Sequence, residues 1–318
     1  MVSKSAQIAN AANKKLEQFM PALFPSGVAL GLFLPGVFAH LRPFVILLFA
    51  MMTLSGALRL TVAEFGKTIR SPLPIIFFML AIRIALPLIA HFASSLFFRG
   101  NTDIITGFVL LFSGSVAVSS FIWTGMFNGN KALCLTLILL DTMLAPVAVP
   151  FTLSILMGET VALDMTGIAI SLVFMVVIPT IVGVTINETS KGKIPAAICP
   201  YLTPLSKIFL MLVIAANSSA VAHAVRLGDP TIWKIAALCA ALSTGVFLAA
   251  RLICALARCK KETLATLVFT SGLKNVSAST TIAVTFFPED VALPVIAGII
   301  LQQVIAAFIG RLLSRDKS

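Results

Sequence analysis

Three ionisable side chains stand in the middle of long apolar runs of this sequence: Arg83, Asp141 and Lys274. A charge at the centre of a bilayer costs at least about 2.5–3.5 kcal/mol, so such a residue faces a partner or a wet cavity. Lys274 could act as a fixed cation or as an amine that titrates. Asp141 could pair with Lys274 or accept protons, and Arg83 could bind an anion or neutralise Asp141. A structural ion pair remains the alternative for each.

Lys274 lies inside a stretch of small polar residues, 270–281, and a similar stretch covers 113–120. Unwound backbone inside a membrane persists where it lines a cavity or binds ions and substrate, so paired interruptions indicate the central site of a transporter. The alternative is that serine and glycine only allow close helix packing. The predicted binding residues are Ser113, Ser115, Ser119, Ser120, Thr270, Ser271, Gly272, Lys274, Asn275 and Ser277, with Arg83, Asp141 and Gln302 as candidates for charge coupling.

The composition places these residues in a membrane protein. Hydrophobic residues make up 59% of the 318 residues and charged residues 11%, whereas a soluble chain has about 25% charged residues. The net charge of +11 is carried by residues between the apolar runs, not by one dense face. The predicted partner is therefore a lipid bilayer and not a nucleic acid.

Ten apolar runs follow one another, each close to the roughly 20 residues that a span requires. They cover 21–38, 41–58, 72–96, 104–126, 132–157, 165–186, 202–225, 232–257, 263–287 and 291–313. We predict an all-α integral membrane protein with ten transmembrane helices in two inverted five-helix repeats, 20–160 and 161–313. The interruptions fall at matching places, so helices four and nine are expected to be discontinuous and to cross.

Basic residues concentrate in alternate gaps between the runs. By the positive-inside rule this bias places both termini in the cytoplasm. The sequence thus predicts a multi-pass protein of the plasma membrane or bacterial inner membrane, with a cytoplasmic lead-in, 1–19, and a cytoplasmic tail, 314–318.

The sequence lacks the residue patterns that are typical of metal centres, disulfide frameworks and nucleotide-binding sites. His40, His91 and His223 have no metal-ligand spacing, the five cysteines indicate no disulfide framework, and no nucleotide-binding glycine-rich loop occurs. We therefore predict no enzyme, no metal centre, no cofactor and no ATPase partner.

Four short motifs, in order along most of the chain, resemble the bile acid:sodium symporter family. They are Leu54–Leu60 followed by Phe65 and Arg70-Ser71-Pro72, then Asn128-Gly129-Asn130 with Leu144-Ala145-Pro146, then Thr270–Asn275, and finally Phe287–Pro294 with Gln302. The resemblance implies ten helices in a core and a panel domain, with two broken helices crossing near sodium sites. It also implies sodium-coupled symport of organic anions such as bile acids or small carboxylates.

The sequence departs from the family where sodium would bind. The family's ninth-helix glutamate falls on Thr270 and its glutamine on Lys274. The other ligand positions fall on Ile82, near Ser119, Ser120 and Phe121, and on Cys134 and Ile138. A lysine ammonium would repel sodium or fill its space.

The sequence therefore predicts a secondary active transporter of a small organic anion, working by alternating access, with sodium coupling lost or altered. Proton coupling through Lys274 and Asp141, or uncoupled exchange, would replace it, so sodium or a proton is the possible coupling ion. The alternative is a cation/proton antiporter of similar fold, in which Asp141 and Lys274 exchange ions. Nothing in the sequence supports a receptor or a scaffold. A channel stays open as an alternative, although no repeated filter sequence is visible.

Overall fold

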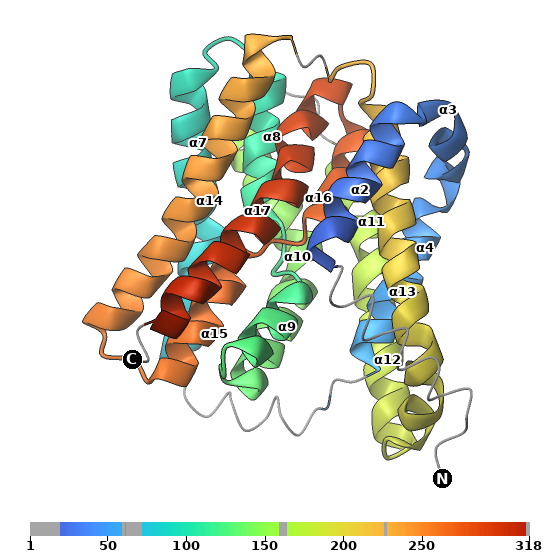
Figure 1. Ribbon diagram of the computed structural model, residues 1–318, viewed down its shortest axis with the longest axis vertical. Helices are drawn as coiled ribbons and strands as arrows, with labels where there is room; N and C mark the ends of the chain where they lie inside the picture. Colours follow the sequence, from blue (N-terminus) through green and yellow to red (C-terminus); the bar gives the residue numbers. More distant parts are fainter. Residues whose placement is uncertain (1–19, 59–60, 62–71, 159–163, 226–227, 316–318) are drawn as a thin grey trace. The chain divides into compact units, whose positions relative to one another are not determined.

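The computed structural model describes residues 20–58, 61, 72–158, 164–225 and 228–315 (Figure 1). Within these residues the regular structure is helical, and one isolated antiparallel bridge joins Val116 to Lys274. The predicted lead-in and the motif residues Arg59, Phe65 and Arg70 lie outside this part of the chain.

Seven helical stretches of the described chain are long and apolar enough to cross a membrane. They are Pro35–Ala57, Ile75–Phe97, Lys131–Met157, Met165–Thr189, Lys193–Ala220, Pro230–Leu256 and Glu289–Leu313. Two shorter apolar helices accompany them, α8 (Thr102–Ser113) and α16 (Val276–Phe286). The predicted all-α membrane class is confirmed, whereas the count of ten spans in inverted repeats stays a prediction.

The chain forms two compact units, and each predicted five-helix half contributes to both. Unit 1 comprises Met1–Ala63 and Ser171–Ala222, and unit 2 comprises Glu64–Ile170 and His223–Ser318.

Unit 1 is built around a long helix, α13, which packs against α2 and α4, while α12 also packs against α4. Its helices are α2 (Met20–Phe33), α3 (Pro35–Phe38), η1 (Ala39–Phe44), α4 (Val45–Ala57), η3 (Val173–Val177), α12 (Ile178–Thr189) and α13 (Lys193–Ala220). Small residues allow this close packing, because a Cβ at Gly31 would meet the Ala215 carbonyl and one at Gly183 would meet Ala57.

Two boundaries in unit 1 differ from the apolar runs. The runs predict a break between 38 and 41, but α2 ends at Phe33 and α3 begins at Pro35. Proline lacks an amide hydrogen and fits the first turn of a helix. The second difference is α13, which begins at Lys193 and not near 202, directly after Gly192 in the left-handed conformation.

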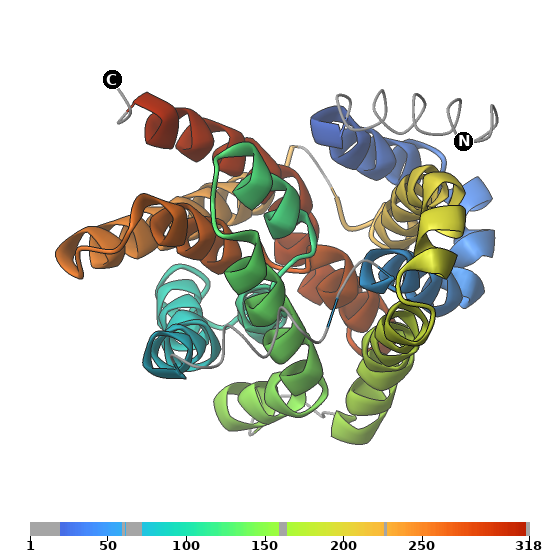
Figure 2. The same ribbon diagram turned by 90° about the horizontal axis from the view of Figure 1, so that it is seen from below.

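Unit 2 contains every residue of the predicted site. Its helices are α6 (Pro72–Leu80), η2 (Ala81–Ala85), α7 (Leu86–Phe97), α8, α9 (Ser119–Met126), α10 (Lys131–Met157), α14 (Pro230–Leu256), α15 (Lys261–Gly272), α16 and α17 (Glu289–Arg315), and α11 (Met165–Leu172) continues from this unit into unit 1. Helix α8 packs against α7, α10, α16 and α17, and α14 packs against α15 and α17 (Figure 2). All ten residues from Ile104 to Ser113 in α8 are buried, so this half-helix ends inside the unit.

A widened π-helical turn, η2, carries Arg83 into the interior of unit 2. In a regular α-helix the ring of Pro87 would clash with the carbonyl four residues earlier, which belongs to Arg83. The wider turn relieves that clash, and π-helical turns within α-helices frequently occur at functional sites.

Candidate transport site

Both predicted interruptions are present, and their unwound segments pair with each other. The first link, Gly114–Val118, separates α8 from α9, and the second link, Leu273–Asn275, separates α15 from α16. The Ala117 amide donates to the Leu273 carbonyl at 3.0 Å, and the Asn275 amide donates to the Ser115 carbonyl at 2.6 Å. Backbone groups that would be costly to leave unpaired in hydrocarbon therefore satisfy one another. We call this pair of links the crossing.

The second link is fixed further by two side chains. The Asn275 side chain caps α16 by accepting a hydrogen bond from the Ala278 amide at 3.3 Å. The Lys274 amide donates to Oε1 of Gln302 on α17 at 3.0 Å. The backbone of Lys274 is therefore held between the first link and α17.

Arg83 and Asp141 form one hydrogen-bonded group at the first link, which we call the brace. Arg83 Nε donates to Asp141 Oδ1 at 2.6 Å, and Nη2 donates to the Asp141 carbonyl at 2.7 Å. Arg83 Nη1 donates to the carbonyl of Ser113, the last residue of α8, at 2.8 Å. Asp141 Oδ2 accepts from the Val116 amide at 2.6 Å. Arg83 is thus paired with Asp141, which is the geometry of one of the two roles that the sequence leaves open for it.

The brace also places a cation at the end of a half-helix. The C-terminal carbonyls of a helix carry a partial negative charge, which a nearby cation stabilises. The Arg83 guanidinium occupies that position on α8, and charge-assisted hydrogen bonds of this kind are strong. Its side chain is 10% exposed and that of Asp141 is fully buried.

Lys274 presents the opposite situation at the second link. Its side chain is buried, with 3% of its surface exposed, and Nζ has no hydrogen-bond partner among the described residues. Lys274 Nζ makes no hydrogen bond to Asp141, whose ion pair in the described structure is with Arg83.

Gln302 contributes a second unpartnered donor. Its Oε1 accepts from the Lys274 amide, and its Nε2 has no partner in the described structure, although only 1% of Gln302 is exposed. Turning the amide around would set two donors face to face, so the assignment of oxygen and nitrogen is fixed by the Lys274 amide. We call Lys274 Nζ and Gln302 Nε2 the orphan donors.

Several predicted hydroxyls donate to backbone carbonyls three or four residues earlier in the chain. Thr270 Oγ1 donates to the Thr266 carbonyl at 2.8 Å, Ser113 Oγ to the Leu110 carbonyl at 3.3 Å, and Ser120 Oγ to the Ala117 carbonyl at 2.7 Å. Ser115, Ser271 and Ser277 are buried at or beside the links, and Gly272 ends α15 against the Phe247 ring.

Ser119 bonds to a residue that the sequence did not single out. Gln303 Nε2 donates to Ser119 Oγ at 3.4 Å, and Gln303 Oε1 accepts from Trp123 Nε1 at 3.2 Å. The sequence carried one signal for this contact, a pair of adjacent glutamines within the apolar run 291–313. Adjacent residues of a helix point in different directions, so the two side chains are expected to meet different partners.

Three positions where the family resemblance places sodium ligands, Ile82, Cys134 and Ile138, carry poor ligands for a hard cation, which prefers oxygen donors. Ile82 and Ile138 are buried hydrocarbon. Cys134 Sγ accepts a hydrogen bond from Thr124 Oγ1 at 3.5 Å and lies 3.7 Å from Ser120 Oγ. The described residues also hold no group of three His, Cys, Asp or Glu side chains that could bind a metal ion.

Comparison with known proteins identifies the kind of protein that carries this site. The sequence matches the Sodium Bile acid symporter family over residues 45–226, which includes the first link. It is 37% identical to the Uncharacterized protein YbaS of Bacillus subtilis over 93% of this chain and 97% of that protein.

Two more distant relatives match this chain over about half of their own lengths. The Probable sodium/metabolite cotransporter BASS2, chloroplastic, of Oryza sativa subsp. japonica is 27% identical over 64% of this chain and 49% of its own. The Uncharacterized sodium-dependent transporter YocS of Bacillus subtilis is 22% identical over 53% of this chain and 52% of its own. With the multiple apolar helices, these matches show that the chain belongs to the sodium bile acid symporter family of membrane transporters.

Proposed function

We propose that this chain is a secondary active transporter of a small organic anion whose sodium coupling has been lost. The proposal includes the predicted ten-span inverted-repeat arrangement, alternating access and cytoplasmic termini. The observation that carries the choice of an anion is the pair of orphan donors. A buried donor without an acceptor costs about 1–3 kcal/mol, and more when it is charged, so such donors indicate a ligand that supplies acceptors.

The chemistry of the orphan donors selects the class of ligand. A lysine ammonium offers three N–H donors and no acceptor, and the primary amide nitrogen of glutamine offers two N–H donors. A carboxylate or a similar oxyanion accepts hydrogen bonds at every oxygen and also neutralises the ammonium. The ligand is therefore expected to be an organic anion of low charge that binds beside the second link.

The loss of sodium coupling is supported by the two cations of the chain itself. In transporters with broken helices, the C-terminal ends of half-helices and unwound carbonyls commonly coordinate sodium. Here the Arg83 guanidinium donates to the terminal carbonyl of α8, and Lys274 lies two residues beyond the end of α15. The Arg83 guanidinium would repel a sodium ion at the first link, and the Lys274 side chain offers a sodium ion no oxygen ligand at the second link.

The cation/proton antiporter is the second candidate, and it requires an acceptor that can receive a cation. Asp141 is the buried carboxylate of the crossing, and both of its oxygens already accept hydrogen bonds from Arg83 and Val116. This observation favours the anion transporter, because a cation would first have to disrupt the brace.

The test is uptake by the purified chain in proteoliposomes. The probes are radiolabelled lactate, gluconate and benzenesulfonate, which differ in size and headgroup and each carry one negative charge. We expect saturable uptake of at least one probe at equal rates in sodium and in choline buffers. Uptake that depends strictly on a sodium gradient would refute the loss of coupling. Exchange of protons for sodium without any organic anion would establish the antiporter instead.

A further inference from the structure

The crossing holds a small set of ionisable groups, and their charges do not cancel. The groups that act electrostatically on Lys274 are Asp141 on α10 and Arg83 on η2. The other neighbours with defined contacts are Gln302 on α17 and the backbone of Val116, and neither titrates. Arg83 and Asp141 neutralise each other within the brace. The net charge of the crossing is therefore decided by the protonation state of Lys274.

Asp141 is bonded within the brace through both of its oxygens. Oδ1 accepts from Arg83 Nε at 2.6 Å, and Oδ2 accepts from the Val116 amide at 2.6 Å. Its charge is therefore paired with that of Arg83. Arginine stays protonated in proteins, so Arg83 cannot exchange a proton.

Lys274 has the opposite properties. A buried ammonium without a counter-ion is costly, and a group in this situation neutralises instead. Lysine changes protonation when it is buried, which is why buried lysines serve as bases and nucleophiles. An anion placed against Nζ would remove that cost, since it supplies both the negative charge and the acceptors that the ammonium needs.

We propose that Lys274 is the proton carrier of the transport cycle and takes up one proton for each monovalent anion bound, so that transport is anion/proton symport without net charge movement. The inference rests on the proposed function, because it needs an organic anion as substrate. In the empty carrier Nζ is a neutral amine. When the anion binds, a proton from the same side of the membrane joins Nζ and forms an ammonium–anion pair. On the other side the anion leaves and the proton follows it, which returns the amine. No charge is left behind.

The experiment uses the full chain in proteoliposomes with the three monoanionic probes, a trapped pH indicator, and valinomycin with potassium to set the membrane potential. We expect one proton to enter with each anion. A gradient of one pH unit, acid outside, should drive accumulation of up to about tenfold at zero potential. A membrane potential of either sign should leave the uptake rate unchanged.

Two substitutions at the same position separate a titrating lysine from a fixed charge. Lys274→Arg keeps a cation that does not release its proton, so net uptake into empty vesicles should be lost while exchange of labelled for unlabelled anion persists. Lys274→Gln removes the charge, so any remaining uptake should lose its proton dependence and respond to the membrane potential. Lys261→Gln makes the same change at an exposed lysine of α15 and should behave as the wild type.

Each outcome decides between the two proposals. Uptake without proton movement, or uptake that follows the membrane potential in the wild type, would overturn the role of Lys274 while leaving the anion transporter intact. Proton coupling that survives in Lys274→Arg would overturn it as well. Failure of all three probes to enter would count against the proposed function itself, and with it against Lys274 as the proton carrier.

Discussion

The two links of the crossing are built alike, but the basic side chains beside them have opposite surroundings. Each link follows a buried half-helix, and each has a cation close to the end of that half-helix. Arg83 at the first link makes three hydrogen bonds and faces a carboxylate, whereas Lys274 Nζ at the second link makes none in the described structure. One cation thus stabilises the fold, and the other is buried at the expense of stability. A group kept in such a position is expected to serve binding.

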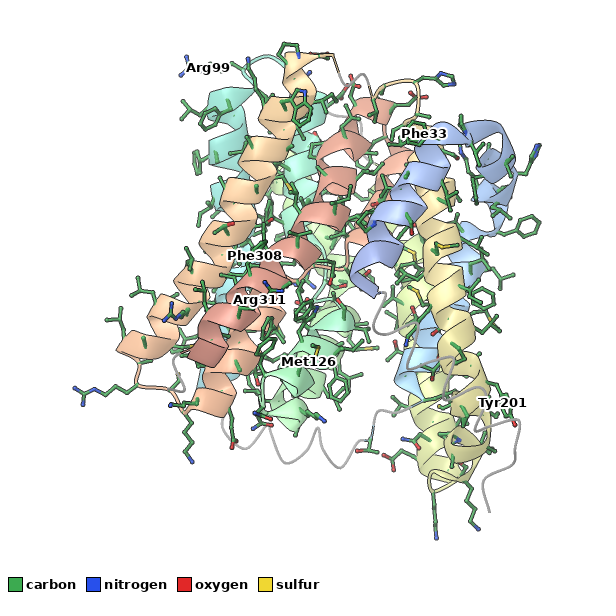
Figure 3. All side chains as sticks on the ribbon, in the orientation of Figure 1. Phe33, Arg99, Met126, Tyr201, Phe308 and Arg311 are labelled. Atoms are coloured by element: carbon green, nitrogen blue, oxygen red, sulfur yellow. The ribbon has the colours of Figure 1, made fainter. Side chains whose placement is uncertain are left out.

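The largest effect should come from removing the cation of the first link. Arg83→Leu leaves Asp141 buried, charged and without its partner, which typically costs about 3–5 kcal/mol. The measurement is unfolding of the detergent-purified chain, followed by temperature or denaturant. Arg99→Leu is the matched control, because Arg99 is exposed beyond the end of α7 (Figure 3) and should tolerate the change.

A double variant tests whether the brace acts as a unit. Arg83→Leu with Asp141→Leu removes both charges together, and replacing a whole buried ion pair by hydrocarbon is often nearly neutral. It should therefore be less destabilised than Arg83→Leu alone. If Arg83→Leu is as stable as Arg99→Leu, the brace does not hold the first link.

Removing the basic side chain of the second link should have the opposite effect on stability. Lys274→Met replaces an unpartnered amine with an apolar chain of similar length, so the free energy of unfolding should rise by about 1–3 kcal/mol. Anion uptake should be lost in the same variant, which is the usual relation between stability and a functional group. Destabilisation comparable to that of Arg83→Leu would mean that Lys274 is a structural partner, as Arg83 is.

The glycines at the two links also meet different surroundings. A Cβ on Gly114 would lie 2.6 Å from the Ser279 hydroxyl, whereas one on Gly272 would run into the ring of Phe247. Phe247 is fully buried and has little room to move, so Gly272→Ala should lower the free energy of unfolding by about 1–3 kcal/mol. Gly245→Ala, in α14 with open space around its Cβ position, should instead raise it by about 0.5–1 kcal/mol. Equal unfolding curves for the two variants would contradict the packing at the second link.

The interruptions, and hence the place of the site, could be predicted because small polar residues in an apolar run are a local signal. Arg83, Asp141 and Lys274 could be picked out for the same reason. Their pairing could not, because Asp141 is separated from Arg83 and Lys274 by long stretches of chain, and charge alone leaves either partner open.

The hydrogen-bond partners that fix the Arg83–Asp141 pair in place are mainly backbone groups. The Ser113 carbonyl and the Val116 amide hold the brace, and no residue type in the sequence marks such atoms. The orphan Nε2 of Gln302 follows from a hydrogen bond between Oε1 and the Lys274 amide. The break at Leu34 was missed for a different reason, since apolar runs continue through a proline that ends one helix and begins another.

The smallest expected effect concerns Asn275, which caps α16 at the second link. Asn275→Ala removes the hydrogen bond to the Ala278 amide, and loss of such a cap costs about 0.5–2 kcal/mol. Asn275→Asp keeps the cap and places a carboxylate at a helix N-terminus, which is favourable, so its unfolding should match the wild type. The same carboxylate stands next to Lys274 in the chain and would compete with a transported anion for the ammonium. Uptake should therefore fall much further in Asn275→Asp than in Asn275→Ala, although the aspartate variant is the more stable of the two. The reverse order of uptake would show that the anion does not bind at the second link.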